Sequence, residues 1–473
     1  MLKKILCALL AGVILMGSVA CANNSDTSND TNDTAATAEG TDTEDRPELP
    51  EKNYGGDQFN ILAKESSYGK LVSEKTNGEI LNDAILEANM SVSQQFNVRF
   101  NHLKGDEKTM ETLILAGDDE YDVAYNHDCS TATLSLNGWF YNIYDLPYID
   151  PTESWWPQFI TESFTLNEKM YYFSNYSSYS AMADTRVCFF NRQILRDHNM
   201  DAPYESVRAG TWTLDQLTAM STSIYTDLNG DGKRDEGDLF GFASTHYPYA
   251  WLEGFGIEFY KKEAPNSAVL TLNTEDERCY TLIEKLHNWF HGGNDGVWVN
   301  VYGAETVSLT MFAEKRAAFT FAGVGRQALM AIEGNVDYGI VPFPKIEASQ
   351  ATYFGGCTDE LFSVPITVRD TERVGIILEA MAYAGYKYIR PAYCEDTLKT
   401  RFATDPDCAE MMNIIFDNQV ISFAYLFALS MSGGNLQFGF IAETVEQNNV
   451  ASVLKRKGKM ERKFVQTISD FYS

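Results

Sequence analysis

The chain has 473 residues and a net charge of −29, with 37 Lys and Arg against 66 Asp and Glu. A protein this negative repels phosphates, which argues against nucleic-acid binding. Hydrophobic residues make up 44% and aromatic residues 13% of the chain, enough for a large core, and this length predicts two domains or lobes.

Residues 1–20 are typical of a secretory signal peptide. Lys3 and Lys4 form a basic start, an apolar run covers 5–16, and small residues follow up to Cys21. The apolar run is too short to cross a bilayer. Bacterial lipoproteins receive lipid on a cysteine in this position, so we expect lipidation of Cys21, although Ser18 stands where such signals usually carry Leu. Secretion without lipid is the alternative.

Residues 21–54 contain almost nothing that could be buried and are rich in Asp, Asn, Thr and Ser. This composition predicts a disordered linker. With a lipid at one end, about thirty polar residues would hold a folded body some tens of ångströms from a membrane. We therefore expect the body to lie on the extracellular face of the bacterial cell membrane.

The body, from Gly55 onward, alternates short apolar strands with amphipathic helices, which predicts an α/β fold. The first expected elements are a strand at 58–64, a helix followed by a strand within 82–100, a helix at 108–117 and a strand at 121–125. Thr213 can cap a further helix, and Asp370 can cap another that stops at Pro391.

The stretch "DLNGDGKRDEGD" at 227–238 has the ligand spacing of a calcium-binding loop, with Gly232 at the sharp turn. A strand follows it directly, so there is no second helix for calcium to move, and we expect structural calcium and no sensor. A polar turn without metal is the alternative. The expected ligands are Asp227, Asn229, Asp231, the carbonyl of Lys233, Asp235 and Asp238.

Several segments, taken together and in this order, resemble the extracellular solute-binding proteins of bacterial ABC importers, particularly the sugar-binding group. The resemblance covers nearly the whole body, although Lys315 stands where relatives usually have Gly. The segments are "EYDVAYNHD", "ESWWPQF", "DTRVCFFNRQIL", "GTWTLDQL", "MFAEKRAAFTFAG", "DYGIVPFPK" and "FSVPITVRDTER".

This resemblance implies a two-lobed, periplasmic-binding-protein-like α/β fold with hinge strands and a ligand cleft between the lobes. It implies one lobe from 55–175 and 322–357, and a second lobe from 176–321 and 358–473 that contains the calcium loop. The protein would then be no enzyme. It would be a receptor that delivers a small solute to a membrane permease, with calcium as its only cofactor.

Ligand-binding residues are implied where the segments match. The aromatic candidates have a structural alternative, because Trp251, like Trp155 and Trp156, could belong to the core. The histidines could equally lie on the surface. The implied residues are Asn126, His127, Asp128, Asp184, Arg186, His246, Tyr249, Trp251, Arg326 and Asp359.

The residue types favour a carbohydrate ligand, and we expect an oligosaccharide. A sugar presents C–H faces to aromatic rings and hydroxyls to charged groups, and the body is rich in both. Two alternatives remain open. One is a surface glycoside hydrolase with paired carboxylates, although no recognisable catalytic stretch is present. The other is a binding protein for a peptide or another polar solute, since one fold serves many ligands.

Overall fold

The structure is a computed structural model that describes residues 46–245, 249–300, 305–325, 336–358, 360–395, 405–432 and 434–473. The expected signal peptide, Cys21 and most of the expected linker therefore lie outside the described residues. Within the described ranges, the helices are all too short or too polar to span a bilayer.

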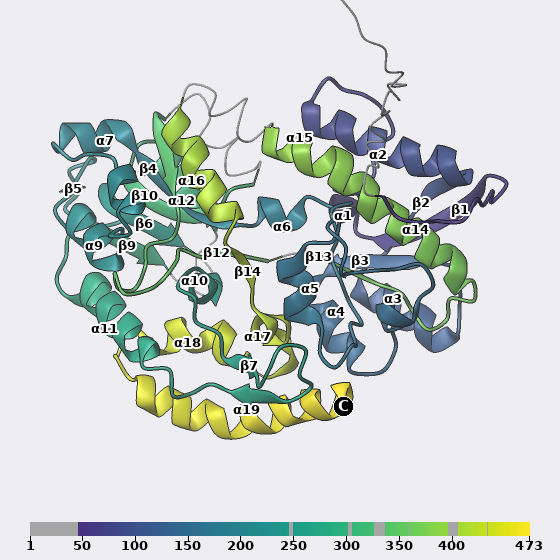
Figure 1. Cartoon of the computed structure of the whole chain (residues 1–473). Coiled ribbons are helices and arrows are strands. Elements are labelled where there is room, and N and C mark those ends of the chain that lie inside the picture. The colour runs from purple at the N-terminus through teal and green to yellow at the C-terminus, as the bar shows by residue number, and fades with distance from the viewer. Residues whose placement is uncertain are drawn as a thin grey trace, which may run out of the picture. The chain divides into compact units, whose positions relative to one another are not determined.

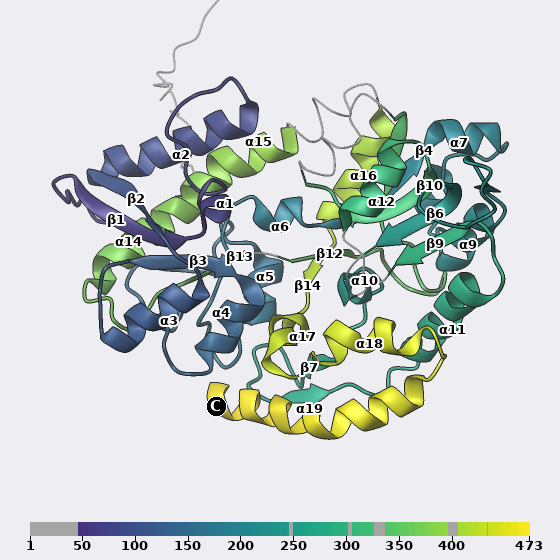
Figure 2. The same cartoon turned by 180° about the vertical axis from the view of Figure 1, so that it is seen from behind.

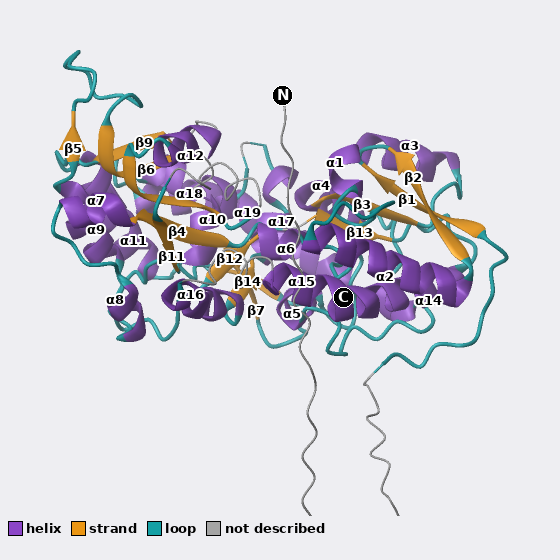
Figure 3. Cartoon of the chain, turned by 90° about the horizontal axis from the view of Figure 1, so that it is seen from above, coloured by secondary structure: helices purple, strands orange, loops and turns teal. Residues whose placement is uncertain are grey.

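The first sheet has four strands in the order β13-β3-β1-β2. Strands β1 (Asp57–Ala63), β2 (Val98–Lys104) and β3 (Val123–His127) run parallel, and β13 (Glu360–Ser363) is antiparallel to β3. Figure 3 shows α2 (Ile80–Phe96) and α14 (Thr371–Ala384) on one face, and α3 (Glu107–Ala116) and α4 (Asp128–Ser135) on the other. Parallel strands require such crossover helices and are covered on both faces.

Local sequence explains the boundaries of these helices. The side chain of Asp106 accepts a hydrogen bond from Thr109 N (3.0 Å) and caps α3, which ends at Gly117 with φ +73°. Asp370 caps α14 in the same way through Arg373 N. Smaller elements of this half are α1 (Glu65–Tyr68), a 3-10 turn at Ile143–Asp145, α5 (Gln158–Phe164), a π-helical turn at Gly385–Ile389 and α15 (Arg390–Glu395).

The second sheet has six strands, in the order β11-β4-β10-β6-β5 with β9 also paired to β6. Strand β10 is parallel to β6 and antiparallel to β4, so the sheet is mixed. Its strands are β4 (Arg186–Asn191), β5 (Tyr225–Thr226), β6 (Leu239–Thr245), β9 (Val297–Asn300), β10 (Ala317–Gly323) and β11 (Tyr338–Val341). Its helices are α7 (Arg192–Asp197), α8 (Tyr204–Arg208), α9 (Leu214–Thr222), α11 (Arg278–His291), α12 (Glu305–Ala313) and α16 (Pro406–Phe416).

Short segments join the two halves (Figure 1). Helix α6 (Ser180–Ala183) leads from the first half into β4, and β12 (Gly355–Cys357) pairs in parallel with β14 (Gln419–Ile421). Strand β12 contacts β4, whereas β14 contacts α5. These paired strands therefore have the position expected of a hinge.

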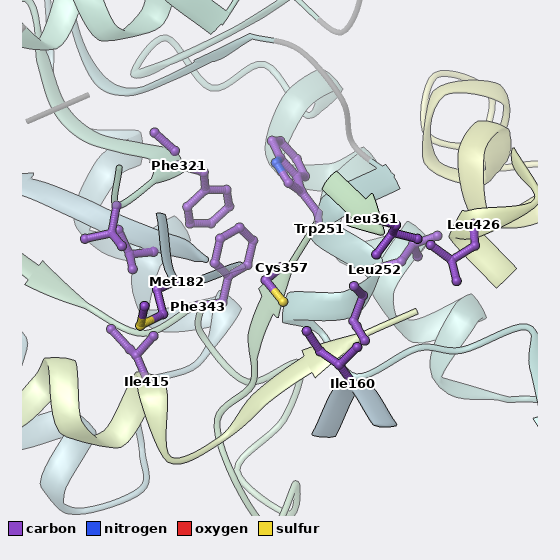
Figure 4. Packing of buried hydrophobic residues seen from close by; sticks show 14 of the residues in the cluster. Ile160, Met182, Trp251, Leu252, Phe321, Phe343, Cys357, Leu361, Ile415 and Leu426 are labelled. Atoms are coloured by element: carbon purple, nitrogen blue, oxygen red, sulfur yellow. The ribbon is translucent and has the colours of Figure 1, made fainter. Parts of the chain in front are cut away.

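Aromatic side chains fill the core, which is continuous through both halves. Around the hinge, Phe321 and Phe343 stack with ring centroids 4.0 Å apart, and Cys357 and Leu252 lie nearby (Figure 4). The indole of Trp212 is fully buried and donates a hydrogen bond to Pro342 O (2.9 Å).

The C-terminal segment runs along both halves (Figure 2). Helix α17 (Phe423–Leu426) packs against α4, α18 (Leu436–Thr444) against α10 (Tyr249–Gly254), and α19 (Val450–Tyr472) against β8 (Leu270–Leu272). At the far end of α19 the hydroxyl of Tyr472 lies 3.4 Å from that of Tyr172. The remaining elements are the hairpin of β7 (Tyr260–Lys262) and β8 (Leu270–Leu272) and a 3-10 turn at Ala428–Ser430.

The strand pairing differs from the expected division into lobes at two places. We expected 322–357 in the first lobe, but β11 pairs with β4 of the second sheet. We expected all of 358–473 in the second lobe, but β13 pairs with β3 and α14 packs against α2 in the first half. The chain thus returns to the first sheet after β12.

Candidate functional site

The first predicted site residues lie where β3 ends. Asn126 is fully buried, and neither atom of its side-chain amide has a hydrogen-bond partner in the described part of the chain. Asp128 starts α4 and is 3% exposed, and its Oδ1 accepts from Cys129 N (2.6 Å) and lies 3.2 Å from His127 Nδ1. Burial raises the pKa of Asp128. A buried amide without a partner costs about 1–3 kcal/mol, so such a group points to a missing partner.

Two more predicted residues lie where the chain enters the second sheet. Asp184 follows α6, and Arg186 is the first residue of β4. Both are partly buried. The negative charge of Asp184 contributes to the raised pKa of Asp128, which places the two carboxyl groups within electrostatic reach of each other.

Sequence reasoning missed Glu253, which lies on α10 and belongs to the same cluster. It is 3% exposed, and neither of its carboxylate oxygens has a hydrogen-bond partner among the described residues. Burial raises the pKa of Glu253 well above its usual range, and Glu258 and Asp128 raise it further while Arg186 lowers it. The position of Glu253 inside the apolar stretch "WLEGFG" was the signal available in the sequence.

A cavity of about 550 Å³ adjoins Glu253. It lies between α5 of the first half and residues 253–262 of the second half, and β14 also lines it. The carboxylate of Glu258 accepts from Tyr260 N (2.9 Å) and Ala424 N (3.3 Å), and burial raises its pKa to about 7. Lys262 Nζ donates to the carbonyls of Glu162 and Thr165, and burial lowers the pKa of Lys262 to about 8.

Trp251 is a core residue, so its expected role as a ligand-binding face is not supported by its placement. Its side chain is 4% exposed and its ring meets Phe242 and Phe321 edge to face, with centroids 6.4 and 5.2 Å apart. Trp155 and Trp156 are likewise buried. These three tryptophans therefore belong to the hydrophobic core, as large apolar rings commonly do.

Four further site predictions cannot be placed. His246, Arg326 and Asp359 lie outside the described residues. Tyr249 begins α10, but its side chain is not among those described. The described part of the site therefore consists of Asn126, His127, Asp128, Asp184, Arg186 and Glu253.

His127, Asp128 and Cys129 bring three possible metal-ligand atoms within 4.8 Å of one another. The Cys129 thiol donates to Tyr425 O (3.2 Å), and burial raises its pKa. Because a metal needs the thiolate, this environment argues against a metal centre.

The expected calcium loop connects β5 and β6. Its side chains accept hydrogen bonds from its own backbone: Asp227 from Gly230 N and Gly232 N (2.7 and 3.0 Å), and Asp231 from Lys233 N (2.8 Å). The side chains of Asn229, Asp235 and Asp238 also accept backbone N–H groups. Gly230 and Gly232 both have φ +72°, which suits the sharp turns.

This donor set fits calcium chemically, because all of its ligand atoms are oxygens. No three of the loop's described carboxylates bring ligand atoms within 4.8 Å of one another in this conformation. Calcium binding would therefore require these carboxylates to move closer together.

Solved binding proteins share this fold. The galacto-N-biose-/lacto-N-biose I-binding protein of the ABC transporter from Bifidobacterium longum, in complex with lacto-N-biose, is 10% identical with a TM-score of 0.55, covering 89% of this chain and 99% of that one. An ABC transporter solute-binding protein from Thermotoga lettingae, bound with alpha-D-tagatose, is 13% identical with a TM-score of 0.51, covering 88% and 100%. UgpB from Mycobacterium tuberculosis, in complex with glycerophosphocholine, is 14% identical with a TM-score of 0.52, covering 88% and 98%.

No protein-family model matches the sequence, and no curated protein matches it. The structural likenesses have low identity but cover nearly the whole of each chain, and they agree with the sheets and hinge strands described above. The chain therefore has the two-lobed α/β fold of the solute-binding proteins of ABC transporters.

Proposed function

We propose that this chain is the solute-binding component of an ABC transporter, which captures an extracellular oligosaccharide and delivers it to a membrane permease. The observation that carries the proposal concerns two polar side chains, Asn126 of the first half and Glu253 of the second half. Both side chains are buried and have no hydrogen-bond partner among the described residues. Sugar hydroxyls both donate and accept, so a sugar can satisfy an amide as well as a carboxylate.

The arrangement also suits a receptor that closes around its ligand. Two halves joined by short strands can move about a hinge, and a solute that touches both halves favours the closed state. The solved proteins of this fold support the ligand class, since the names of two of them include lacto-N-biose and tagatose.

Localisation and calcium are part of the same proposal. A lipid on Cys21 and a polar linker would keep the receptor at the outer face of the cell membrane, beside its permease. Calcium in the 227–238 loop would brace one edge of the second sheet, because Asp238 accepts a hydrogen bond from the hydroxyl of Tyr225 on the edge strand β5 (3.1 Å).

A thermal-shift screen of the purified protein tests the proposal. Oligosaccharides, monosaccharides, peptides and polyols are compared in calcium buffer. A solute that binds only the folded state stabilises it by about 2.7 kcal/mol at a hundredfold excess over its Kd. A rise in Tm with one class of sugar supports the proposal. A response to peptides alone would favour a peptide receptor, and turnover of an aryl-glycoside would favour a hydrolase.

A further inference from the structure

The cavity that Glu253 lines is walled by three parts of the chain. Phe159, Glu162 and Ser163 of α5 come from the first half, and all of β14 comes from the hinge. Glu253 and most of 256–262 form the wall of the second half. At about 550 Å³ the cavity has the size of pockets that hold small organic molecules, about 300–1,000 Å³. A solute that satisfies Glu253 therefore has this space beside it.

Much of the cavity wall is apolar. Ile257, Ile421 and Phe423 line it and are buried. The ring of Phe354 lies against Gly256, where φ is +67° and an added Cβ would come within 2.2 Å of the ring. Glycine at this position thus makes the turn and leaves room for the aromatic ring. Such a wall favours an apolar group, because burial removes the surface of that group from water.

The uncharged polar side chains of the cavity bond other parts of the protein. Gln419 Nε2 donates to Thr185 Oγ1 (2.7 Å), and Ser163 Oγ donates to the carbonyl oxygen of Ile421 (3.1 Å). The second of these bonds joins α5 to the hinge strand β14. These side chains therefore have less capacity left to bind the hydroxyls of a sugar ring.

Among the charged side chains of the cavity, Glu253 differs from the others. Glu258 and Lys262 make the hydrogen bonds to backbone groups described above. Glu162 and Lys261 are exposed, so water solvates them. Glu253 is 3% exposed, and neither of its oxygens has a hydrogen-bond partner among the described residues. The cavity thus combines an apolar wall with one buried polar group that lacks a described partner.

We propose that the captured solute is a glycoside whose aryl or alkyl group fills this cavity while a hydroxyl of its sugar bonds Glu253. This inference rests on the proposed receptor function and narrows its ligand class. A sugar ring inside the cavity would lose the hydration of several hydroxyls and find few new partners, which is unfavourable. An apolar group has no such hydroxyls to satisfy.

Titration calorimetry on the full-length protein tests the inference with matched glycosides. Methyl and phenyl β-glucosides, and the corresponding galactosides, differ only in the group attached to the sugar. We expect each phenyl glycoside that binds to do so at least about tenfold more tightly than its methyl partner, a difference of ~1.4 kcal/mol. Equal affinities would overturn the inference and leave the receptor function standing. Silence toward every glycoside would also overturn the inference, and the thermal-shift screen would then decide on the proposed function.

Val420→Trp tests where the phenyl group binds. Val420 lines the cavity, and a larger side chain there should lower the affinity of the phenyl glycosides to that of the methyl glycosides. Val269→Trp is the matched control and should keep the preference, because Val269 is exposed between β7 and β8 and is not among the residues that line the cavity.

Thermal unfolding shows whether each variant folds. If Val420→Trp does not, Phe159→Ala takes its place, since it removes part of the apolar wall and should also reduce the preference for phenyl. A preference that survives unchanged in the folded cavity variant would overturn the inference.

Discussion

Trp155 donates its indole N–H to Glu379, with 2.6 Å between Nε1 and Oε1, and the neighbouring Trp156 donates to the other oxygen at 3.0 Å. Glu379 lies on α14, so this buried carboxyl ties the loop before α5 to a helix more than two hundred residues later. The tryptophan pair is thereby fixed as a structural element of the first half.

Replacing Glu379 with Ala leaves two buried indole N–H groups without an acceptor. Each such group costs about 1–3 kcal/mol, so we expect a loss of roughly 2–6 kcal/mol in urea unfolding. Glu372→Ala is the control, since Glu372 forms an exposed ion pair with Lys52 and should lose less than about 0.5 kcal/mol. Equal losses in the two variants would mean that the indole bonds contribute nothing.

The buried carboxyls make stability depend on pH. Burial raises the pKa of Glu379 and of Glu461 from 4.5 to about 7. The folded protein therefore holds more protons than the unfolded chain between these values, and stability falls as pH rises through that window. Asp276 and Asp337 have a pKa below the ordinary value of 3.8, so their contribution to stability is fully present above that pH and is lost only as pH falls below it.

We accordingly expect a higher Tm at pH 5 than at pH 7.5, measured without solute at constant ionic strength. Glu461→Gln should flatten this slope, because the amide stays neutral throughout and can still accept from Leu436 N. A Tm that rises from pH 5 to pH 7.5 would contradict the conclusion that burial raises the pKa of these carboxyls.

Calcium should stabilise the second half without taking part in binding. We expect a chelator to lower the Tm of the unmodified protein. The Asp231→Ala variant lacks a central ligand, so in calcium it should have a lower Tm that does not respond to the chelator. Solute affinity at low temperature should stay unchanged. A chelator that leaves Tm unaltered would mean that the loop is a polar turn without metal.

The contact between β12 and α10 should position Glu253. A Cβ added at Gly356 would lie 2.7 Å from Glu253 Cβ and 2.8 Å from Gly254 N. Gly356→Ala should therefore push α10 away from β12, cost about 1–3 kcal/mol and weaken solute binding. Gly69→Ala is the control, since its nearest contact would be at 3.9 Å. If Gly356→Ala binds the solute with unchanged affinity, the contact between β12 and α10 does not position Glu253 for binding.

Much of the fold could be predicted from the sequence, because the signals were local. The Asp106 and Asp370 caps and the alternation of strands and helices depend on nearby residues. The lobe assignment of β11 and β13 was wrong because a four-residue buried strand carries no mark of its partner. Glu253 was missed because a single acid on a helix normally faces solvent, and only the packing of α10 on β12 shows that it does not.

The most direct test of the receptor is Asn126→Leu, measured by thermal unfolding without solute and by titration with the solute found in the screen. Leu has the same number and branching of side-chain heavy atoms as Asn and removes a buried amide that has no described partner. The account predicts an unchanged or higher Tm without solute, since no hydrogen bond is lost, together with at least a tenfold loss of affinity, ~1.4 kcal/mol. A lower Tm with unchanged affinity would show that Asn126 serves the fold alone, and would contradict a solute site at this junction.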